Sequence, residues 1–360
     1  MNPIALASPQ VGSAEREAVD RVLRSGQLAG GAEVAAFEEE FSATASGRRC
    51  VAVNSGTAAL HLGLLAAGVG PGDEVIVPSF TFAATANSVA LTGATPVFVD
   101  IDPRTFCLSP DAVSAAIGPQ TAGIMPVHLY GHAAPMTAIQ QLADRHGLMI
   151  FEDAAQAHLG SVDAAPVGTF GAFGAFSFYP TKNMTTGEGG MLTCESSEFA
   201  RTVKLLRNQG MESRYANEIV GFNARMSDIH AAMGRVQLGR LQGWTERRRE
   251  NASFLDSALR GVLTPYVTPG VFHVYHQYTI RIIDHDRDRF STELGRLGIP
   301  SAVYYPTPVH KLASFGQSLD LPETSLAAEQ VLSLPIHPGL SQHDLERIVI
   351  AVNQLTNAGA

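Results

Sequence analysis

The sequence predicts an α/β protein built around a mostly parallel sheet, and three observations lead to this prediction. Seven short apolar runs follow one another between residues 50 and 193, and helix-like stretches separate most of them. The runs are almost continuous in apolar residues, as expected for strands covered on both faces. The chain of 360 residues is 45% hydrophobic, which is enough for more than one core, so we expect one large and one small domain.

The expected elements begin with two helices. Ser13 is suited to cap a helix that runs to about Arg24, and Gly26 is suited to end it. The next helix has an apolar face formed by Val34, Phe37 and Phe41. The expected strands cover residues 50–54, 74–78, 95–100, 122–127, 148–153, 174–178 and 189–193. The later run of three arginines at 247–249 is flanked by glutamates and is interpreted as a solvated helix face.

The composition argues against several classes of protein. A formal net charge of −9 and an isoelectric point near 5.7 would not attract nucleic acid or an anionic membrane. Cys50, Cys107 and Cys194 are far apart and form no CxxC pair, so neither a disulfide framework nor a zinc site is expected. We find no signal-peptide pattern and no apolar run long enough for a membrane span. The expected location is therefore a reducing cytoplasm.

The residues that follow the strands are candidates for a binding site, because ligands of such sheets bind beyond the carboxyl ends of the strands. Ser55, Gly56 and Thr57 follow the first run and precede a helix, whose free N–H groups can bind an anion. A plain helix cap is the alternative. Phe82 follows the second run, where it either stacks on a flat ligand or belongs to the core.

Two further candidates are an acid at a strand end and an unusual lysine. The fifth run ends in Glu152 and Asp153, which strand alternation directs to opposite faces. A buried carboxylate needs a cation or hydrogen-bond donors. The chain has three lysines, and Lys182 lies among hydroxyls and glycines in "SFYPTKNMTTGEGGM", with aromatic and apolar residues just before it. This setting is more typical of a pocket than of a surface.

A site for pyridoxal phosphate (PLP) would explain these residues together. This cofactor requires a lysine that holds its aldehyde as a Schiff base and a cradle for its phosphate. It also requires a carboxylate beside the pyridine nitrogen and a flat apolar face for the ring. In this sequence Lys182 is the candidate lysine, and residues 55–57 with Ser177 are the candidate phosphate cradle. Asp153 is the candidate carboxylate, and Phe82 is the candidate flat face.

The chain resembles the DegT/DnrJ/StrS family of aminotransferases, which aminate nucleotide-linked keto-sugars. The resemblance covers nearly the whole chain and follows the family's order of motifs. These motifs are "GGAEVAAFEEEF", "VNSGTAALHLGL", "GDEVIVPSFTFAATANSV", "FEDAAQAHLG", "SFYPTKNMTTGEGGM", "GFNARMSDIHAAMGRVQL", "YYPTPVHK" and "LSLPIHPGL".

The resemblance implies a role for each matching residue. Lys182 binds PLP covalently, Asp153 pairs with the pyridinium nitrogen and Gln156 bonds the ring hydroxyl. The phosphate contacts match Gly56, Thr57 and Ser177, and the stacking aromatic matches Phe82. Asn223 matches an asparagine that reaches the phosphate from a second subunit, so a homodimer with shared active sites is implied. The implied fold is that of the aspartate aminotransferase superfamily, with a large domain and N-terminal arm over residues 1–242 and a small α/β domain over residues 243–360.

The resemblance also implies the reaction. Glutamate donates its amino group in one half-reaction and a nucleotide-linked keto-sugar accepts it in the other, so the cofactor alternates between PLP and pyridoxamine phosphate (PMP). Because Lys182 stands where some relatives carry histidine, amino transfer is favoured over dehydration. Two alternatives stay open: an aminotransferase acting on a keto-cyclitol, and a non-catalytic regulator that keeps the fold.

Contacts with the sugar substrate are predicted less directly. Tyr304, Tyr305 and His310 resemble the family's loop near the sugar and nucleotide, but packing roles are an equal alternative. Arg207 either meets an anionic group of the substrate or caps its own helix.

Two pairs of histidines complete the set of candidates. No metal site is expected from His128 and His132, because Gly131 argues against a helix between them. The strand-like segment with His273 and His276 is expected in the sheet of the small domain.

Overall fold

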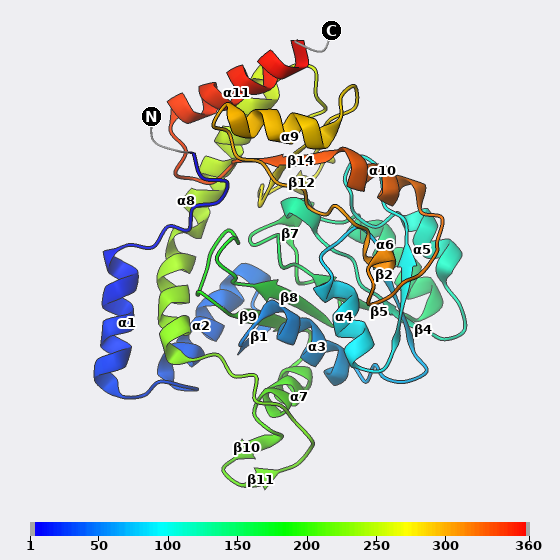
Figure 1. The fold of residues 1–360 in the computed structure, drawn as a ribbon. Coiled ribbons are helices and arrows are strands. Elements are labelled where there is room, and N and C mark those ends of the chain that lie inside the picture. Colours follow the sequence, from blue (N-terminus) through cyan, green and yellow to red (C-terminus); the bar gives the residue numbers. More distant parts are fainter. Residues whose placement is uncertain (1–3, 358–360) are drawn as a thin grey trace.

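The computed structural model describes residues 4–357 and contains a central seven-stranded sheet (Figure 1). The strands, in their order across the sheet, are β1 (Arg49–Val53), β9 (Gly190–Cys194), β8 (Phe173–Ser177), β5 (Met149–Asp153), β4 (Thr121–Ile124), β2 (Glu74–Pro78) and β3 (Thr95–Val99). Within this sheet β9 runs antiparallel to β1 and β8, and the other pairs are parallel. The predicted α/β class with a mostly parallel sheet is confirmed.

Both faces of this sheet are covered, which explains the nearly continuous apolar runs. Neighbouring residues of one strand belong to two different cores: Ile150 packs in one and Phe151 in the other. The Ile150 core is completed by α2 (Ala32–Ser42), α5 (Pro110–Ala116) and α6 (Met136–His146). The Phe151 core is completed by α3 (Gly56–Ala66), α4 (Ala84–Leu91) and α7 (Ser197–Arg207).

The N-terminal helix differs from its prediction at one end. Helix α1 (Ser13–Ser25) ends at Gly26 as predicted, but its N-cap is Gly12, and Ser13 is already helical. The reason is Glu15, whose carboxylate accepts a hydrogen bond from the N–H of Gly12 at 2.7 Å. An acidic side chain inside the first turn thus replaces the expected serine cap.

The long helix α8 (Asp228–Ala258) connects the two ends of the molecule (Figure 1). Its first residue, Asp228, accepts hydrogen bonds from the N–H groups of Gly31, Glu33 and Val34 and so caps α2. Toward its other end, α8 packs against α11 (Gln342–Asn357). The predicted domain boundary between residues 242 and 243 lies inside this helix. The prediction of a solvated face at 247–249 is wrong for Arg248, which is buried.

The C-terminal part forms its own core around the antiparallel pair β13 (Tyr278–Arg281) and β14 (Val331–Leu334). Helices α9 (Arg287–Arg296), α10 (Pro322–Gln330) and α11 accompany this pair. The predicted strand-like segment contains β13 itself, but its part with His273 and His276 is not a strand of that sheet. It connects β13 to β12 (Val271–Phe272), which instead pairs with β6 (Ser161–Val162) beside β7 (Ala165–Pro166).

The remaining elements are small. A hairpin of β10 (Met211–Ser213) and β11 (Ala216–Asn217) projects at the lower edge of Figure 1. Three short 3-10 turns cover Ala43–Ala45, Leu129–Gly131 and Val309–Lys311. Within residues 4–357 no helix combines the length and hydropathy needed to cross a membrane.

Candidate active site

Lys182 and Asp153 come together at the carboxyl ends of neighbouring strands. Strand β5 ends at Asp153, and β8, which pairs with it, ends at Ser177. Lys182 follows in the connection from β8 to β9, where its N–H donates to Tyr179 O at 2.9 Å. Asp153 is 5% exposed, and Lys182 is partly buried. These two residues therefore meet at the edge of the sheet where the sequence predicts the binding site.

The electrostatics of this pair are perturbed in opposite ways. Burial lowers the pKa of Lys182 to about 8, although the charge of Asp153 raises it. Burial raises the pKa of Asp153, while a hydrogen bond from Thr85 Oγ1 at 2.8 Å and one from the Ala155 N–H at 3.2 Å lower it. A lysine with a pKa near neutral is a usable nucleophile and base, and the acid keeps donors that favour its charged form.

The neighbouring acid, Glu152, has its partners elsewhere. Its oxygens accept hydrogen bonds from the N–H groups of Gly168 and Phe170, both at 2.7 Å, and lie 3.0 Å from His128 Nε2. This confirms the prediction that the two acids face opposite sides. Glu152 therefore supports the loop that follows β5, whereas Asp153 faces the lysine.

The N-terminus of α3 lies against the same edge. Ser55 is the N-cap and accepts a hydrogen bond from the Ala58 N–H at 3.1 Å. In the described part of the chain, the N–H groups of Gly56 and Thr57 have no hydrogen-bond partner. A Cβ on Gly56 would lie 2.7 Å from Cβ of Ser177, so only glycine allows the helix to approach β8 this closely. The result is a cradle of free donors beside Ser177.

An exposed aromatic ring and an amide complete the site. Phe82 is 58% exposed, which is unusual for so large an apolar side chain, and its ring centroid lies 6.0 Å from that of Tyr305. Gln156 Nε2 donates to the Tyr305 hydroxyl at 3.1 Å, and Gln156 Oε1 accepts from the Tyr130 N–H at 2.7 Å. Tyr305 thus brings the C-terminal part of the chain against residues that follow β2 and β5.

Three other predicted residues have different surroundings. His310 is buried, and its Nδ1 lies 2.6 Å from the hydroxyl of Ser79, just after β2. Asn223 is exposed, and its backbone pairs with that of Asn208. Arg207 Nη1 contacts the carboxylate of Glu38 and the carbonyl of Ala52. None of these contacts joins them to Lys182.

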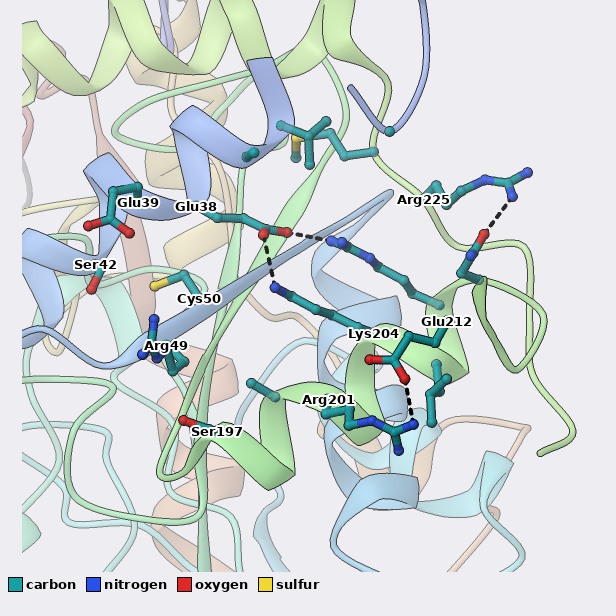
Figure 2. Close-up of a pocket in the computed structure, with 18 of the residues that line it drawn as sticks. Glu38, Glu39, Ser42, Arg49, Cys50, Ser197, Arg201, Lys204, Glu212 and Arg225 are labelled. Carbon is teal, nitrogen blue, oxygen red and sulfur yellow. Dashed lines mark hydrogen bonds and ion pairs between the residues drawn. The ribbon is translucent and has the colours of Figure 1, made fainter. Parts of the chain in front are cut away.

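Arg207 lies instead in a broad pocket of about 960 Å³. Figure 2 shows that charged side chains of both signs line it, among them Glu38, Lys204 and Arg225. The pocket is formed by α2, β1, α7 and the segment before α8. It is therefore separate from the strand ends that carry Lys182 and Asp153.

Sequence reasoning missed two residues of the site. Thr85 bonds Asp153 but is one of several threonines and serines after β2, with no pattern that singles it out. His158 is 1% exposed between Phe176 and Phe178, and the charge of Lys182 adds to burial in lowering its pKa to about 3. His158 lies two residues after Gln156 in the same motif, and no pattern in the sequence distinguishes it.

Nothing in residues 4–357 groups three or more potential metal ligands. His128 is engaged by Glu152 and by the Ala134 N–H, and His132 accepts a hydrogen bond from the Thr268 N–H. A flat phosphorylated aldehyde fits the site described above. The donors of α3 suit its phosphate, Phe82 its ring, Asp153 its ring nitrogen and Lys182 its aldehyde.

Comparison with known proteins agrees with this geometry. Residues 9–353 match the model of the DegT/DnrJ/EryC1/StrS aminotransferase family. The chain is 41% identical over 345 residues to dTDP-3-amino-3,4,6-trideoxy-alpha-D-glucose transaminase of Streptomyces venezuelae, covering 94% of this chain and 90% of that protein. It is also 41% identical over 341 residues to a "pleiotropic regulatory protein" of Geobacillus stearothermophilus, covering 92% and 91%.

Among solved structures, the PLP form of the putative sugar aminotransferase Spr1654 from Streptococcus pneumoniae superposes with a TM-score of 0.95. That chain is 29% identical, and each chain is covered completely. The likeness therefore extends over the sheet, the C-terminal part and the connection between them.

Proposed function

Since the chain belongs to the DegT/DnrJ/EryC1/StrS aminotransferase family, we propose that it transfers an amino group from L-glutamate to the keto group of a nucleotide-linked sugar. It is a PLP-dependent sugar aminotransferase. The observation that best supports this chemistry is the meeting of Lys182 and Asp153 at the ends of β8 and β5, each with a perturbed pKa. The keto group is expected at C3 or C4 of a deoxyhexose.

Lys182 is proposed to bind the cofactor and to move protons. When bound, PLP supplies an electron-withdrawing ring that stabilises negative charge on the carbon that loses a proton. With a pKa of about 8, the Lys182 amine is partly neutral near pH 7, as both attack on an aldehyde and proton abstraction require. Its place in the connection from β8 to β9, residues 178–189, puts this amine beyond the strand ends.

Asp153 is proposed to hold a proton on the ring nitrogen of the cofactor. This role requires the charged carboxylate, although burial favours the neutral acid. The hydrogen bonds from Thr85 and Ala155 oppose burial, because both donate to the carboxylate oxygens. A protonated ring nitrogen next to this carboxylate would add a further favourable charge.

The other predicted contacts position the cofactor. We propose that the free N–H groups of Gly56 and Thr57, together with Ser55 and Ser177, bind its phosphate. We propose that Phe82 stacks on its ring, which the exposure of this side chain supports. The amide of Gln156 is proposed to bond the ring hydroxyl, in addition to its contact with Tyr305.

Contacts with the sugar remain predictions of differing support. Tyr305 is favoured, because its hydroxyl and ring already touch Gln156 and Phe82. His310 is near the end of β2, and its Nε2 has no partner among the described residues. Arg207 is paired with Glu38 in the separate pocket, so its predicted role has no support from its neighbours.

We also propose that two chains form a dimer with shared active sites. The segment after α7 exposes several large apolar side chains: Tyr215 at 79%, Val220 at 91% and Phe222 at 42%. Such a cluster is typical of a surface that a partner covers. Asn223 follows it directly and is exposed, as expected for a residue that reaches into a second subunit.

The reducing cytoplasm remains the expected location, in keeping with three free and buried cysteines.

Mass spectrometry of the reaction products would test the proposed reaction. The protein is incubated with PLP, glutamate and a panel of nucleotide-linked 3-keto and 4-keto hexoses and keto-cyclitols. We expect one nucleotide-linked sugar to gain an amino group, and the Lys182→Ala variant to give no product. Amination of a keto-cyclitol alone would favour that alternative. No product from any acceptor, together with no bleaching of the bound cofactor by glutamate, would favour the regulator.

A further inference from the structure

The side chain of Asn183, the residue after Lys182, is held at both ends of its amide. Its Nδ2 donates a hydrogen bond to the carbonyl of Val274 at 3.1 Å, and its Oδ1 lies 3.3 Å from Nδ1 of His276. Because a carbonyl can only accept, the bond to Val274 fixes which end of the amide faces His276. Asn183, Val274 and His276 are all buried, and we call them the amide clamp.

The amide clamp requires one particular form of His276. The amide oxygen of Asn183 is an acceptor, so Nδ1 of His276 has to carry a proton and donate it. Burial lowers the pKa of His276 well below its ordinary value, and the nearby charges of Lys182 and Arg248 lower it further. His276 is therefore neutral near pH 7, and it contributes a hydrogen bond rather than a charge to the surroundings of Lys182.

The segment that carries Val274 and His276 is itself fixed from two sides. Nη1 of Arg248, a buried residue of α8, donates to the carbonyls of Tyr275 at 3.1 Å and His276 at 3.4 Å. On the other side, the N–H of Val274 donates to the carbonyl of Gly131 at 3.0 Å. A Cβ on Gly131 would lie 2.8 Å from the backbone N of His276, so only glycine allows this approach.

Tyr275, between the two residues of the amide clamp, has an unfavourable backbone conformation. Its φ is 45°, in the left-handed region that residues other than glycine rarely adopt. Such a conformation persists where the surroundings impose it, and it is concentrated at functional sites. Here the contacts with Arg248 and Gly131 impose it, and it places Val274 and His276 at the two ends of the Asn183 amide.

We propose that Asn183 and His276 are positioning residues that hold Lys182 beside Asp153, beyond the ends of β5 and β8. This inference rests on the proposed function, which gives the amine of Lys182 its role. Asn183 is joined to Lys182 by a peptide bond, so a displacement of its side chain moves the backbone of the lysine. Because α8 carries Arg248, the same contacts link the placement of the lysine to the position of the C-terminal core.

Competitive labelling of the cofactor-free protein with acetic anhydride, followed by mass spectrometry, measures the pKa of Lys182 directly. The chain has two other lysines, Lys204 and Lys311, and both are exposed and serve as internal references. For the wild type we expect a midpoint near pH 8, because burial lowers the pKa of Lys182 to about 8. The charge of Asp153 opposes this effect, and His158 is neutral because its pKa is lowered to about 3.

Two variants of His276 separate its hydrogen bond from its shape. His276→Phe keeps a ring of similar size but cannot donate to Asn183, whereas His276→Asn keeps a donor near the position of Nδ1. In His276→Phe the loosened loop exposes the amine of Lys182 to water, so we expect the labelling midpoint to rise by about one to two pH units. At pH 7 this leaves roughly 10- to 100-fold less neutral amine, and attachment of PLP should slow by the same factor. His276→Asn should stay close to the wild type.

His132→Phe is the matched control. His132 is also buried, and its ring accepts one hydrogen bond, from the N–H of Thr268 at 3.1 Å, so its loss should reduce stability without reaching Lys182. Asn183→Leu breaks the amide clamp from the other side and should raise the midpoint as His276→Phe does, which keeps the test decisive if one of these variants does not fold.

A midpoint that stays near pH 8 when the amide clamp is broken overturns the inference. So does an equal rise in His132→Phe, which would indicate a general loss of stability. A rise in His276→Asn as large as that in His276→Phe also overturns it, because the lost donor would then not be the cause. Failure of the wild type to react with glutamate, while labelling of Lys182 behaves as expected, counts against the proposed function instead.

Discussion

Lys182 has a pKa that should govern how the protein takes up its cofactor. Attack on the aldehyde requires the neutral amine, and the pKa of Lys182 is lowered to about 8. In stopped-flow mixing of cofactor-free protein with PLP, we expect the rate of attachment to rise with pH through about 8 and to level off above it. An ordinary lysine would continue to accelerate toward a pKa near 10.4.

The same experiment has an internal control. The negative charge of Asp153 raises the pKa of Lys182, so Asp153→Asn should move the midpoint of attachment to lower pH. A midpoint that stays in place would mean that the two side chains do not interact in solution.

Thr85 should act on the reaction through Asp153. Its hydroxyl donates to the carboxylate and lowers the pKa of Asp153, so Thr85→Val should raise that pKa. The carboxylate is then lost at higher pH, and we expect the acid limb of the pH profile of kcat to move upward. Ser88→Ala is the matched control, because Ser88 is buried on the same helix and bonds the carbonyl of Thr85 instead. Equal profiles for both variants would contradict a positioning role.

Some residues of the site could be predicted from the sequence, and others could not. Lys182 and Asp153 could be found because a lone lysine among hydroxyls and an acid at a strand end are both costly unless paired. Arg248 was hidden, because a run of three arginines flanked by glutamates is typical of a solvated face. Its burial depends on the N-terminal segment and on residues near 276 and 337, contacts that no local pattern reports.

Among the elements, the central strands were predicted within a few residues at each end, since apolar runs covered on both faces are distinctive. The strand-like segment around His273 and His276 was predicted only in part: Tyr278–Arg281 is a strand of the C-terminal sheet, but the part with the two histidines is not. Its alternation of apolar and polar residues resembles a strand, but the backbone carbonyls there bind Arg248 and Arg249 rather than a neighbouring strand. Side-chain partners of this kind come from tertiary contacts, which alternation does not encode.

Two helical glycines should respond to substitution in opposite directions. A Cβ on Gly63 of α3 would lie 2.6 Å from the buried ring of Phe173, whereas a Cβ on Gly239 of α8 meets nothing within 4 Å. We expect Gly63→Ala to reduce the free energy of unfolding by about 1–3 kcal/mol through overpacking. Gly239→Ala should increase it by up to about 1 kcal/mol through helix propensity. Denaturant titration of cofactor-free protein measures both, and a stabilised Gly63→Ala variant would contradict the packing of α3 on β8.

At the level of the whole molecule, the proposed dimer makes a prediction about mixed subunits. Lys182→Ala and Asn223→Ala should each be nearly inactive, for different reasons. If Asn223 serves the partner's site, a mixed dimer has one intact site, so co-expression should restore roughly a quarter of wild-type activity, given random pairing. Light scattering should report two chains per particle. No recovery from a mixture of well-folded subunits would place Asn223 in the site of its own chain, or outside it.

Helix α8 has a consequence for how the chain can move. A hydrogen-bonded helix has no loose backbone angle in its interior, so residues 242 and 243 offer no hinge. A rotation of the C-terminal core therefore has to move the end of α8 with it as a rigid body. Because Arg248 belongs to this part of α8, such a rotation would change the distance between its guanidinium and the loop of Lys182. The C-terminal core and the packing beneath the loop of Lys182 would then change in a single movement.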